Sequence, residues 1–458
     1  MTEEAKEIKE HITEVKIESD YDKKRREALA QIDNAKFGWF HIRTCCVAGS
    51  NPPTSVFKSN SQVVSIQGLM IFLRVLLGIG IGGDYPLSAV IASEFATTKR
   101  RGAMISAVFA MQGIGILVAA IISTITVAAF QSTISPDDYS HIDYIWRIVT
   151  GCGAIPGCIA LYFRLTIPET PRYTMDIERN IDQAAADINT VLEHGVYKPR
   201  EQEVVVKVDA PKFSVSDFFR YFGKWENGKV LFGTAFTWFA LDVAFYGIGL
   251  NNNIILGNIG FLGDGRDPYE TLFKASVGNI IIALLGTVPG YWVTVFTVDF
   301  WGRRPIQLLG FAVLTVVFII LGFAYKQIKE ITWLFIIFFT IAQFFFNFGP
   351  NATTFVVPGE VFPTRYRSTG HGISAAAGKL GAIISQVGFF KLKDIGGKDA
   401  YIDNLFKIFA VFMLSGLIVT YFCVPETKGK TLEELSNEDQ DGFIKGVNKP
   451  KIIEANAS

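Results

Sequence analysis

The stretches FAVLTVVFIILGF (Phe311–Phe323) and ITWLFIIFFTIAQFFF (Ile331–Phe346) contain no charged residue. A helix on the core of a soluble protein shows charged and polar side chains at helical spacing on its outer face. A helix that crosses a bilayer needs about 20 mostly apolar residues, because lipid offers no hydrogen-bond partner to the backbone. The two stretches are therefore typical of membrane-spanning helices rather than of buried core helices.

Similar apolar runs recur along the whole chain. They cover residues 66–88, 104–130, 147–166, 230–250, 275–298, 306–324, 332–356, 370–390 and 405–423. Of the 458 residues, 50% are hydrophobic and only 19% are charged, against about 25% charged in soluble proteins. This composition excludes a disordered chain, a coiled coil and a disulfide-built secreted module. We expect an all-α, polytopic membrane protein with about nine transmembrane helices.

The charged and metal-binding residue types exclude several functions. The formal net charge is zero, and a nucleic-acid-binding protein would carry a basic excess or a concentrated basic patch. The five cysteines and five histidines show no spacing typical of a metal site, and no arrangement suggests a catalytic nucleophile. We therefore expect no nucleic-acid partner, no metal, no cofactor and no enzymatic activity. The polar first 35 residues argue against a cleavable signal peptide.

The charges of the short loops predict the orientation of the chain in the membrane. One side carries basic clusters, which are Lys99-Arg100-Arg101, Arg303-Arg304, Arg365 with Arg367, and Lys428 with Lys430. The other side carries Asp137-Asp138 with Asp143, and the loop 264–270. The positive-inside rule places the first side, and with it the C-terminus, in the cytoplasm.

Two short patterns occur twice, each time at the end of an apolar run. Glu94 precedes Arg101-Gly102 by seven residues, and Glu360 precedes Arg367-Ser368 by the same spacing. The second pattern is PETP at 168–171 and PETK at 425–428. The chain is therefore predicted to consist of two related halves, as in transporters built from repeated helix bundles.

The two halves are unequal. Glu360 ends the fourth of six runs in the second half, whereas Glu94 ends the first of only three runs in the first half. By this comparison, three helices are missing from the N-terminal half. We expect a polar arm over 1–64 in place of the missing helices, a partial N-terminal bundle over 65–168, a cytoplasmic linker over 169–229, a six-helix C-terminal bundle over 230–424 and a cytoplasmic tail over 425–458. In the linker, Met175–Leu192 and Ser214–Tyr221 are predicted helices, the second at the membrane interface.

Four motifs carry a resemblance to a known family. GGDYPLS (82–88) resembles the signature of the phosphate:proton symporters of the major facilitator superfamily. DFWGRR (299–304), GEVFPTR (359–365) and PETKG (425–429) look like motifs shared by the sugar and phosphate branches of that superfamily. The closest likeness is to fungal high-affinity inorganic phosphate transporters, and it begins at residue 65 and extends to about residue 440.

The resemblance implies a two-bundle fold and proton-coupled import of inorganic phosphate by alternating access. It also implies phosphate, protons and the lipid bilayer as partners, and the plasma membrane as the location. Family members have twelve spans, and the first three, with aspartates implicated in proton coupling, have no counterpart here. Two alternatives stay open, which are a sugar or polyol carrier of the same fold and a truncated, non-transporting member of the family.

Lys379 lies near the middle of the 370–390 run, flanked by small and apolar residues. Its distance from both ends of the run is too great for the side chain to reach the interface easily. A cation inside the membrane usually faces a cavity and has a partner. We interpret Lys379 either as one half of a structural ion pair or as a ligand for an anionic substrate.

Asp242 is central in the 230–250 run. Trp238, Asp242 and Tyr246 are four residues apart, so they share one helix face. A carboxylate beside phosphate would repel the anion until the carboxyl group takes up a proton. Protonation of Asp242 and entry of phosphate would thus be linked, which is the thermodynamic form of symport.

The resemblance assigns further roles to polar residues in the spans. The family's phosphate contacts match Tyr85, Gln112, Trp238, Asp242, Tyr246, Asn351 and Lys379, although each alone is more often a helix–helix hydrogen bond. Asp84 and Asp242 are the candidate proton carriers. Asp84 has a competing interpretation as an ion-pair partner of Arg74 or of a missing helix. Arg74 itself is expected to pair with an acidic residue of the missing helices.

Charged residues at the cytoplasmic ends of the spans are candidate gating residues. These are Glu94, Arg101, Asp299, Arg303, Glu360 and Arg367, with Arg74 as a further candidate salt-bridge residue. We interpret the six as salt bridges between the bundles that close the cytoplasmic side in the outward-facing state. The alternative is that they are solvated charges that only set topology.

Overall fold

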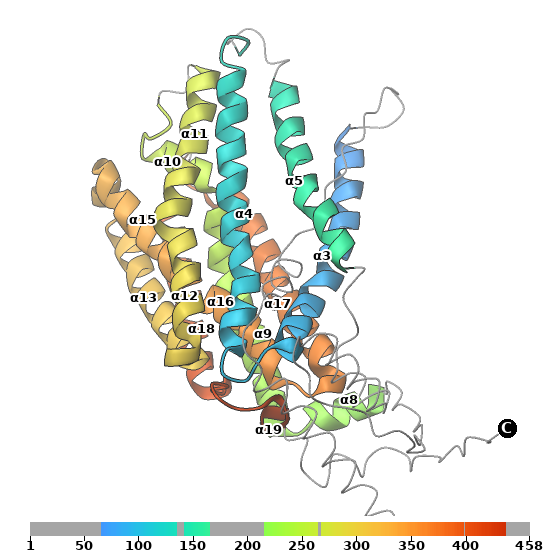
Figure 1. Ribbon diagram of the computed structural model, residues 1–458. Coiled ribbons are helices and arrows are strands. Elements are labelled where there is room, and N and C mark those ends of the chain that lie inside the picture. The colour runs from blue at the N-terminus through green and yellow to red at the C-terminus, as the bar shows by residue number, and fades with distance from the viewer. Residues whose placement is uncertain (1–65, 135–141, 165–214, 264–266, 398, 437–458) are drawn as a thin grey trace, which may run out of the picture.

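The computed structural model describes residues 66–134, 142–164, 215–263, 267–397 and 399–436. Within these ranges all regular secondary structure is helical, and the long helices run side by side (Figure 1). Eight of the described helices are long and apolar enough to cross a membrane. The prediction of an all-α, polytopic membrane protein is therefore confirmed. The expected arm over 1–64 and the helix at Met175–Leu192 lie outside the described residues.

The first helix group consists of α3 (Ile66–Phe95), α4 (Arg101–Ala129) and α5 (Ile142–Arg164). These helices match the predicted runs 66–88, 104–130 and 147–166. Among the residues searched, the apolar stretch of α5 covers Tyr144–Ala160, and α5 is not one of the eight candidate spans. The end of the ninth predicted run, 147–166, lies outside the described residues.

The second helix group begins after the linker and runs from α9 to α18. Its long helices are α9 (Trp225–Gly249), α11 (Pro268–Ile282), α12 (Val288–Trp301), α13 (Arg303–Phe323), α15 (Thr332–Asn347), α16 (Pro350–Val361), α17 (Thr364–Leu392) and α18 (Ile402–Cys423). Short helices lie at the ends of the spans, which are α8 (Val215–Phe222), α10 (Asn252–Asn258), α14 (Tyr325–Glu330) and α19 (Leu432–Ser436). α8 matches the linker helix predicted at Ser214–Tyr221.

Two of the predicted runs are not plain α-helices. The run 275–298 contains a π-helical turn, η1 (Ala283–Thr287), directly before Pro289, which has no N–H to donate. The run 332–356 is divided between α15 and α16. A Cβ on Gly310 would lie 2.5 Å from Pro350 Cδ, so the division lets the chain approach α13 closely. The predicted membrane span over 332–356 is confirmed, since Thr332–Val361 is one of the eight candidate spans, but it consists of two helices.

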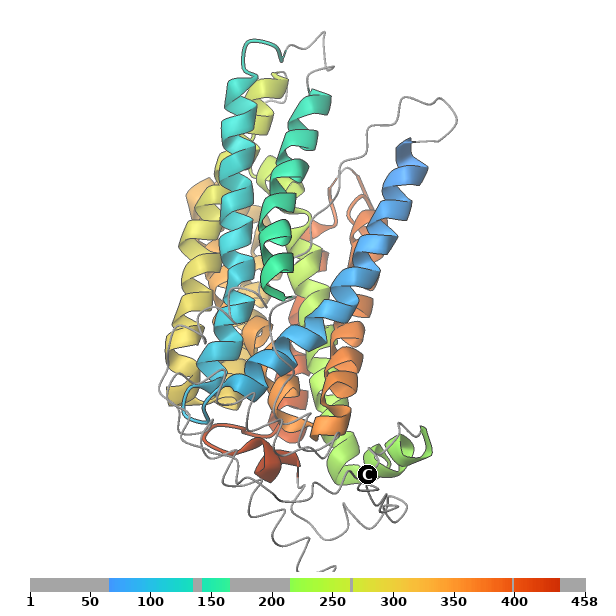
Figure 2. The ribbon, with the colours of Figure 1, turned by 45° about the vertical axis from the view of Figure 1, so that its right-hand side comes forward.

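Small residues bring the central helices close together. α17 packs along α9, and a Cβ on Gly381 of α17 would lie only 2.5 Å from the carbonyl oxygen of Phe239 on α9. Such close contacts are typical of membrane helices, whose association depends on packing rather than on exclusion of water. α3 lies against α17, and α4 lies against α12, so the first helix group covers one side of the second (Figures 1 and 2).

Candidate functional site

Lys379 and Asp242 form an ion pair in the middle of the adjoining helices α17 and α9. Lys379 Nζ donates to Asp242 Oδ2 at 3.2 Å and to the hydroxyl of Tyr246 at 2.9 Å. Asp242 is 1% exposed, whereas the Lys379 side chain is 41% exposed. The pair therefore combines a carboxylate shielded by protein with a cation that other groups can reach.

Trp238 completes the face that α9 turns toward α17. Its indole is 1% exposed, and a Cβ on Gly378 would lie 2.5 Å from Trp238 Cδ1 and 2.8 Å from Asp242 Oδ2. Gly378 thus provides the space in which the indole and the carboxylate lie against α17. Trp238, Asp242 and Tyr246 all face α17, as their spacing predicts.

The first helix group reaches this site through Tyr85 of α3. The ring of Tyr85 lies 6.1 Å from the ring of Trp238, and Lys379 Nζ lies 5.4 Å above the centre of the Tyr85 ring. The same ammonium lies 4.5 Å from the centre of the Tyr246 ring. A cation over an aromatic face is stabilised by about 0.5–2 kcal/mol, depending on desolvation. The ammonium of Lys379 is thus contacted by one phenol ring from each helix group.

A second polar cluster joins α4, α12 and α16. The hydroxyl of Tyr291 donates to Gln112 Oε1 at 3.1 Å, and Asn351 Nδ2 donates to the Tyr291 oxygen at 2.7 Å and to Asn347 Oδ1 at 2.8 Å. Gln112 and Asn351 were predicted site residues, but the sequence analysis missed Tyr291 and Asn347. The available signal was that Tyr291 is the only tyrosine in the run 275–298 and follows Pro289-Gly290.

Aromatic rings fill the space between the two polar clusters. Phe109 stacks on Phe355 with ring centres 4.5 Å apart, and Phe355 lies 5.5 Å from Tyr85. Phe109 also lies 5.8 Å from Tyr291. The sequence analysis missed Phe109 and Phe355, because a phenylalanine in an apolar run carries no signal of its position. The two clusters therefore share one aromatic wall between the helix groups.

At the end of the spans where α8 and α19 lie, one ion pair joins the two helix groups directly (Figure 1). Arg367 Nη1 of α17 lies 2.7 Å from Glu94 Oε1 of α3, and both side chains are buried. This pair has the position expected of a salt bridge between the bundles. Its burial argues against the alternative of solvated topology charges for these two residues.

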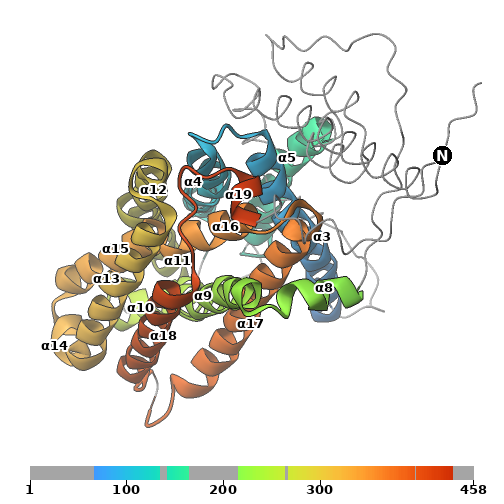
Figure 3. The same ribbon diagram turned by 90° about the horizontal axis from the view of Figure 1, so that it is seen from below.

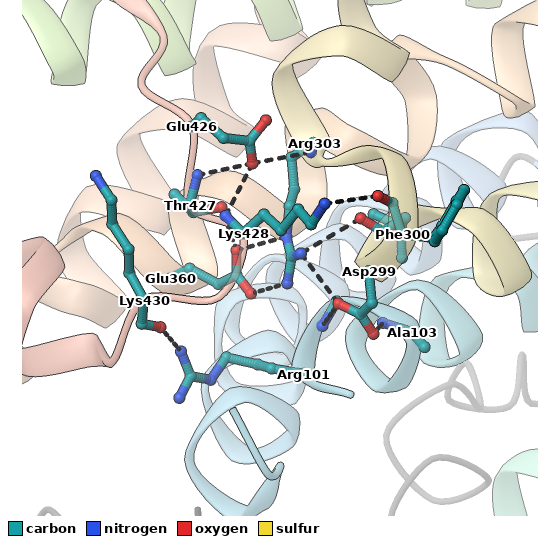
Figure 4. A network of polar contacts seen from close by, with 12 residues as sticks. Arg101, Ala103, Asp299, Phe300, Arg303, Glu360, Glu426, Thr427, Lys428 and Lys430 are labelled. Carbon is teal, nitrogen blue, oxygen red and sulfur yellow. Dashed lines mark hydrogen bonds and ion pairs between the residues drawn. The ribbon is translucent and has the colours of Figure 1, made fainter. Parts of the chain in front are cut away.

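Arg303 makes a second buried network at the same end (Figure 4). Its guanidinium donates to Glu360 Oε1 at 2.7 Å and to Oε2 at 3.1 Å, and lies 3.0 Å from Asp299 Oδ1. All three residues belong to the second helix group. The expectation that Arg303 and Glu360 bridge the two bundles was therefore wrong, because DFWGRR and GEVFPTR end neighbouring helices of the same group.

Asp299 does connect the groups, through backbone amides rather than through a basic side chain. Its carboxylate accepts hydrogen bonds from the N–H groups of Gly102 at 3.0 Å and Ala103 at 2.9 Å (Figure 4). These N–H groups belong to the first turn of α4, where they have no partner within the helix. A carboxylate is stabilised at this position by the helix dipole.

The chain that follows α18 crosses the same end of the spans, and residues 425–431 are named the C-terminal strap here. The Glu426 carboxylate accepts from the backbone N–H groups of Arg303 and Arg304 at 3.1 and 3.0 Å. The Thr427 hydroxyl donates to Glu360. Arg101 Nη1 of α4 donates to the carbonyl oxygen of Lys430 at 3.0 Å (Figure 4). The PETKG motif of the sequence thus ties both helix groups together, a role that its sequence alone did not indicate.

Arg74 and Asp84 are both on α3 but do not form a pair with each other. Ten residues of α-helix separate them by about 15 Å along the axis. Arg74 is exposed and has no ion-pair partner within the part of the chain that the structure describes, while Asp84 is half-buried next to Tyr85. The alternative of an Arg74–Asp84 ion pair was therefore wrong.

The site offers hydrogen-bond donors to an anion. Lys379 supplies an ammonium, Tyr85 and Tyr246 supply hydroxyls, and Gln112 supplies amide N–H groups. The two N–H groups of Asn351 already donate to Tyr291 and Asn347. No group of three His, Cys, Asp or Glu residues that could hold a metal ion exists among the described residues. Two groups of membrane helices with an ion pair and polar side chains inside the apolar spans are typical of a secondary transporter of a small polar solute.

The comparisons with known proteins agree with this class. The family described as "Sugar (and other) transporter" matches residues 55–438, and the chain belongs to this family. It is 43% identical to the repressible high-affinity phosphate permease of Neurospora crassa, over 92% of this chain and 90% of the permease. It is 45% identical to the inorganic phosphate transporter PHO84 of Saccharomyces cerevisiae, over 82% of this chain and 68% of PHO84.

Solved structures show the same fold. The major facilitator superfamily proton:xylose symporter XylE bound to 6-bromo-6-deoxy-D-glucose superposes with a TM-score of 0.62 at 21% identity, covering 86% of this chain and 82% of XylE. The inward-open form of XylE from E. coli gives a TM-score of 0.52 at 22% identity, with 86% and 81% covered. The chain thus has the two-bundle fold of this superfamily and is a multi-pass membrane protein.

The match to the Neurospora crassa permease extends over 520 aligned positions, more than the 458 residues of this chain. The permease therefore contains residues without a counterpart here.

Proposed function

We propose that this chain binds inorganic phosphate between its two helix groups and carries it across the membrane together with protons. The single observation that carries the proposal is the partly accessible ammonium of Lys379, held by Asp242 and Tyr246 at mid-span. The phosphate permease of Neurospora crassa and PHO84, at 43% and 45% identity, support phosphate as the substrate.

Proton coupling follows from the charge of the Lys379–Asp242 pair. With Asp242 ionised, the pair is neutral and the carboxylate repels an incoming anion. A proton on Asp242 Oδ2 removes that repulsion and leaves Lys379 as a net positive charge that attracts phosphate oxygens. Two charges about 4 Å apart interact by about 4 kcal/mol at the effective dielectric constant of a protein site. The proton and the anion would therefore enter as a pair.

Release would reverse these steps on the cytoplasmic side. When Asp242 loses its proton, its carboxylate regains the ion pair with Lys379 and displaces phosphate. No covalent bond to phosphate forms or breaks, and one proton moves with each cycle of Asp242. Asp84, half-buried beside Tyr85, is the second candidate carrier on the same route.

Access would alternate between the two sides of the membrane. The Arg367–Glu94 pair, the contacts of Asp299 with α4 and the C-terminal strap hold the cytoplasmic end closed. These contacts must break before phosphate can leave inward. We place the chain in the plasma membrane with this end in the cytoplasm, in line with its basic loops.

A phosphate-binding protein that does not transport is the second candidate. The observation that favours it is that Lys379, Asp242 and Tyr246 all belong to the second helix group, whereas the first group contributes only α3, α4 and α5 among the described helices. We propose that the partial N-terminal bundle over 65–168 lacks three helices of the family. Alternating access requires two bundles that move against each other, so binding could persist where transport does not.

The test uses the full chain purified into liposomes. Labelled phosphate is offered with an inward proton gradient, with and without a protonophore and with excess glucose. Uphill uptake that the protonophore abolishes supports symport. Binding without uptake or exchange supports the second candidate, and competition by glucose favours a sugar or polyol carrier. Absence of phosphate binding contradicts both phosphate proposals.

Asp242→Asn and Lys379→Ala assign the roles within the site. Asparagine mimics the protonated carboxyl group, so D242N should retain phosphate binding and lose accumulation driven by the proton gradient. K379A should lose binding itself. Lys391→Ala is the matched control, because Lys391 is an exposed lysine near the end of the same helix. Unchanged uptake in both site variants would contradict the assignment.

A further inference from the structure

α8 lies at the cytoplasmic ends of α9 and α17 and extends sideways from them (Figures 1 and 3). Its inner face packs on Tyr366, the third residue of α17. The rings of Phe218, Tyr221 and Phe222 have their centres 5.7, 5.7 and 5.9 Å from that of Tyr366. This aromatic cluster fixes which side of α8 faces the protein and which side faces away.

An ion pair holds α8 in the same orientation. Asp217 Oδ2 lies 2.6 Å from Arg365 Nη1, and the Asp217 and Arg365 side chains are only 19% and 17% exposed. The hydroxyl of Tyr366 donates a further hydrogen bond to Asp217. α8 is therefore anchored to the first turn of a membrane-spanning helix, so its position relative to the membrane surface is set by the fold.

The outward face of α8 and of the turn that follows is apolar and basic. Val215, Phe219 and Trp225 are 58%, 68% and 75% exposed. Arg220 and Lys224 are exposed next to them. Of the two acidic residues in the segment, Asp217 is paired with Arg365 and only Glu226 is exposed. We refer to Val215, Phe219, Arg220, Lys224 and Trp225 as the α8 face.

Large apolar side chains left in water are unfavourable, because their surface gains free energy when it is removed from water. At the cytoplasmic end of a membrane protein, the boundary between lipid headgroups and acyl chains can take them up. Helices with this combination of exposed aromatic and basic residues lie in the membrane interface, and tryptophan is enriched there. The cytoplasmic leaflet is negatively charged, so its charge is complementary to Arg220 and Lys224.

We propose that the α8 face is a binding site for anionic phospholipids of the cytoplasmic leaflet. Phe219 and Trp225 insert at the level of the acyl-chain boundary, while Arg220 and Lys224 donate hydrogen bonds to the acidic headgroup. The partner is thus a lipid surface with phosphate and carboxylate groups. This site is separate from the Lys379–Asp242 site and does not depend on phosphate transport.

The test measures which lipid touches Trp225. The full chain is placed in bilayers of phosphatidylcholine that contain a fixed fraction of either brominated phosphatidylserine or brominated phosphatidylcholine. Bromine quenches tryptophan emission on contact. Because the chain has seven tryptophans, the Trp225 signal is the difference between the chain and its Trp225→Phe variant. We expect phosphatidylserine to be enriched around Trp225 by at least about fivefold, the effect of one basic side chain at an anionic surface.

Charge variants decide whether Arg220 and Lys224 cause the preference. R220Q/K224Q should quench equally with both lipids, whereas R220K/K224R, which keeps both charges, should retain the preference. K326Q/K391Q removes two exposed lysines at the opposite end of the spans and should also retain it. Raised salt should weaken the preference by screening.

Three outcomes would overturn the proposal. Equal quenching by both lipids in the unaltered chain would show an interfacial helix without headgroup selection. A preference that survives R220Q/K224Q would place the selective charges elsewhere. Absence of Trp225 quenching by either lipid would show that the α8 face does not touch the membrane.

Discussion

α9 in the second helix group and α3 in the first are both apolar spans of at least 25 residues, but the chain covers them very differently. Of the apolar 18-residue window of α9, 61% is buried by the rest of the protein, against 22% for α3. On the uncovered part of α3, several large apolar side chains are 49–69% exposed. They are Ile71, Phe72, Val75, Leu76 and Ile79. The second helix group encloses its own helices, whereas α3 depends on lipid or further protein.

Glycines show the same difference at the scale of single atoms. A Cβ on Gly113 of α4 would lie 2.6 Å from the ring of Tyr291, whereas a Cβ on Gly78 or Gly82 of α3 would meet no atom within 4 Å. Gly113 of α4 and Gly381 of α17 therefore lie at close contacts with neighbouring helices, whereas these two glycines of α3 do not. The second helix group, whose helices cover one another, thus builds the Lys379–Asp242 ion pair, while both groups contribute to the contacts at the end of the spans near α8.

The largest effect is expected for Lys379→Ala, in the second helix group. Removal of the ammonium leaves Asp242 buried without its counter-charge, and breaking a buried ion pair costs about 3–5 kcal/mol. We expect phosphate binding to fall by at least about 100-fold, since about 2.7 kcal/mol corresponds to that factor, and the thermal midpoint in detergent to fall as well.

The double variant D242N/K379M sharpens this prediction. Because it removes both charges, it should regain most of the thermal stability without regaining phosphate binding. A double variant as unstable as K379A would contradict the ion pair as the reason for the loss.

The second-largest effect is expected for Glu360→Gln, at the end of the spans where the ion pairs hold the helices together. Glu360 is 0% exposed and binds Arg303 through both carboxylate oxygens. We expect a loss of about 3 kcal/mol in stability, at the lower end of the range for a broken buried pair, because the amide keeps one hydrogen bond. Thermal unfolding measures it. Glu330→Gln, an exposed acid at the opposite end, is the control and should leave the midpoint unchanged.

A smaller effect is expected for Glu94→Gln. This substitution should separate the two helix groups without unfolding either of them. Loss of the charge weakens the contact with Arg367 and should shift the chain toward the inward-open arrangement. A cysteine at Ser374, which is buried between this pair and the site, should then react with a maleimide about tenfold faster, corresponding to about 1.4 kcal/mol. The native cysteines are replaced beforehand. An unchanged rate would show that the Arg367–Glu94 pair does not control closure.

The smallest effect is expected for Arg74→Leu on the sparsely covered α3. Arg74 is exposed and has no ion pair within the described residues, so its removal should change the thermal midpoint by no more than the ±0.5 kcal/mol typical of surface substitutions. Membrane insertion should improve, because an arginine at the centre of a helix costs about 2.5–3.5 kcal/mol to insert. A clear loss of stability would reveal a partner for Arg74 outside the described residues.

The sequence predicts the spans well because a lipid environment demands long apolar runs, and α13 and α18 begin and end within a few residues of them. The division at Gly349 was not predicted, although Gly349-Pro350 in the middle of the run is a dipeptide typical of a helix break. Lys379 and Asp242 were identifiable as charges in apolar runs. Tyr291 of the second polar cluster and Phe355 of the aromatic wall were not, because their position depends on how helices distant in sequence pack.

The interaction partners of Arg303 show a further limit. A basic residue at a span end is consistent with topology, with a bridge between groups or with a pair inside one group. Only the packing of α13 beside α16 makes Glu360 its partner. The same holds for the C-terminal strap, whose PETKG motif was recognised but whose contacts with Arg101 and Arg303 required the folded arrangement.

The C-terminal strap also has a consequence for the order of synthesis. Its residues leave the ribosome after every described span, so Glu360 and the first turn of α13 are translated long before Glu426 and Thr427 exist to bind them. Until then, Arg101 and Glu360 lack their contacts with the strap. The strap can therefore join the two helix groups only after all the described spans have been made.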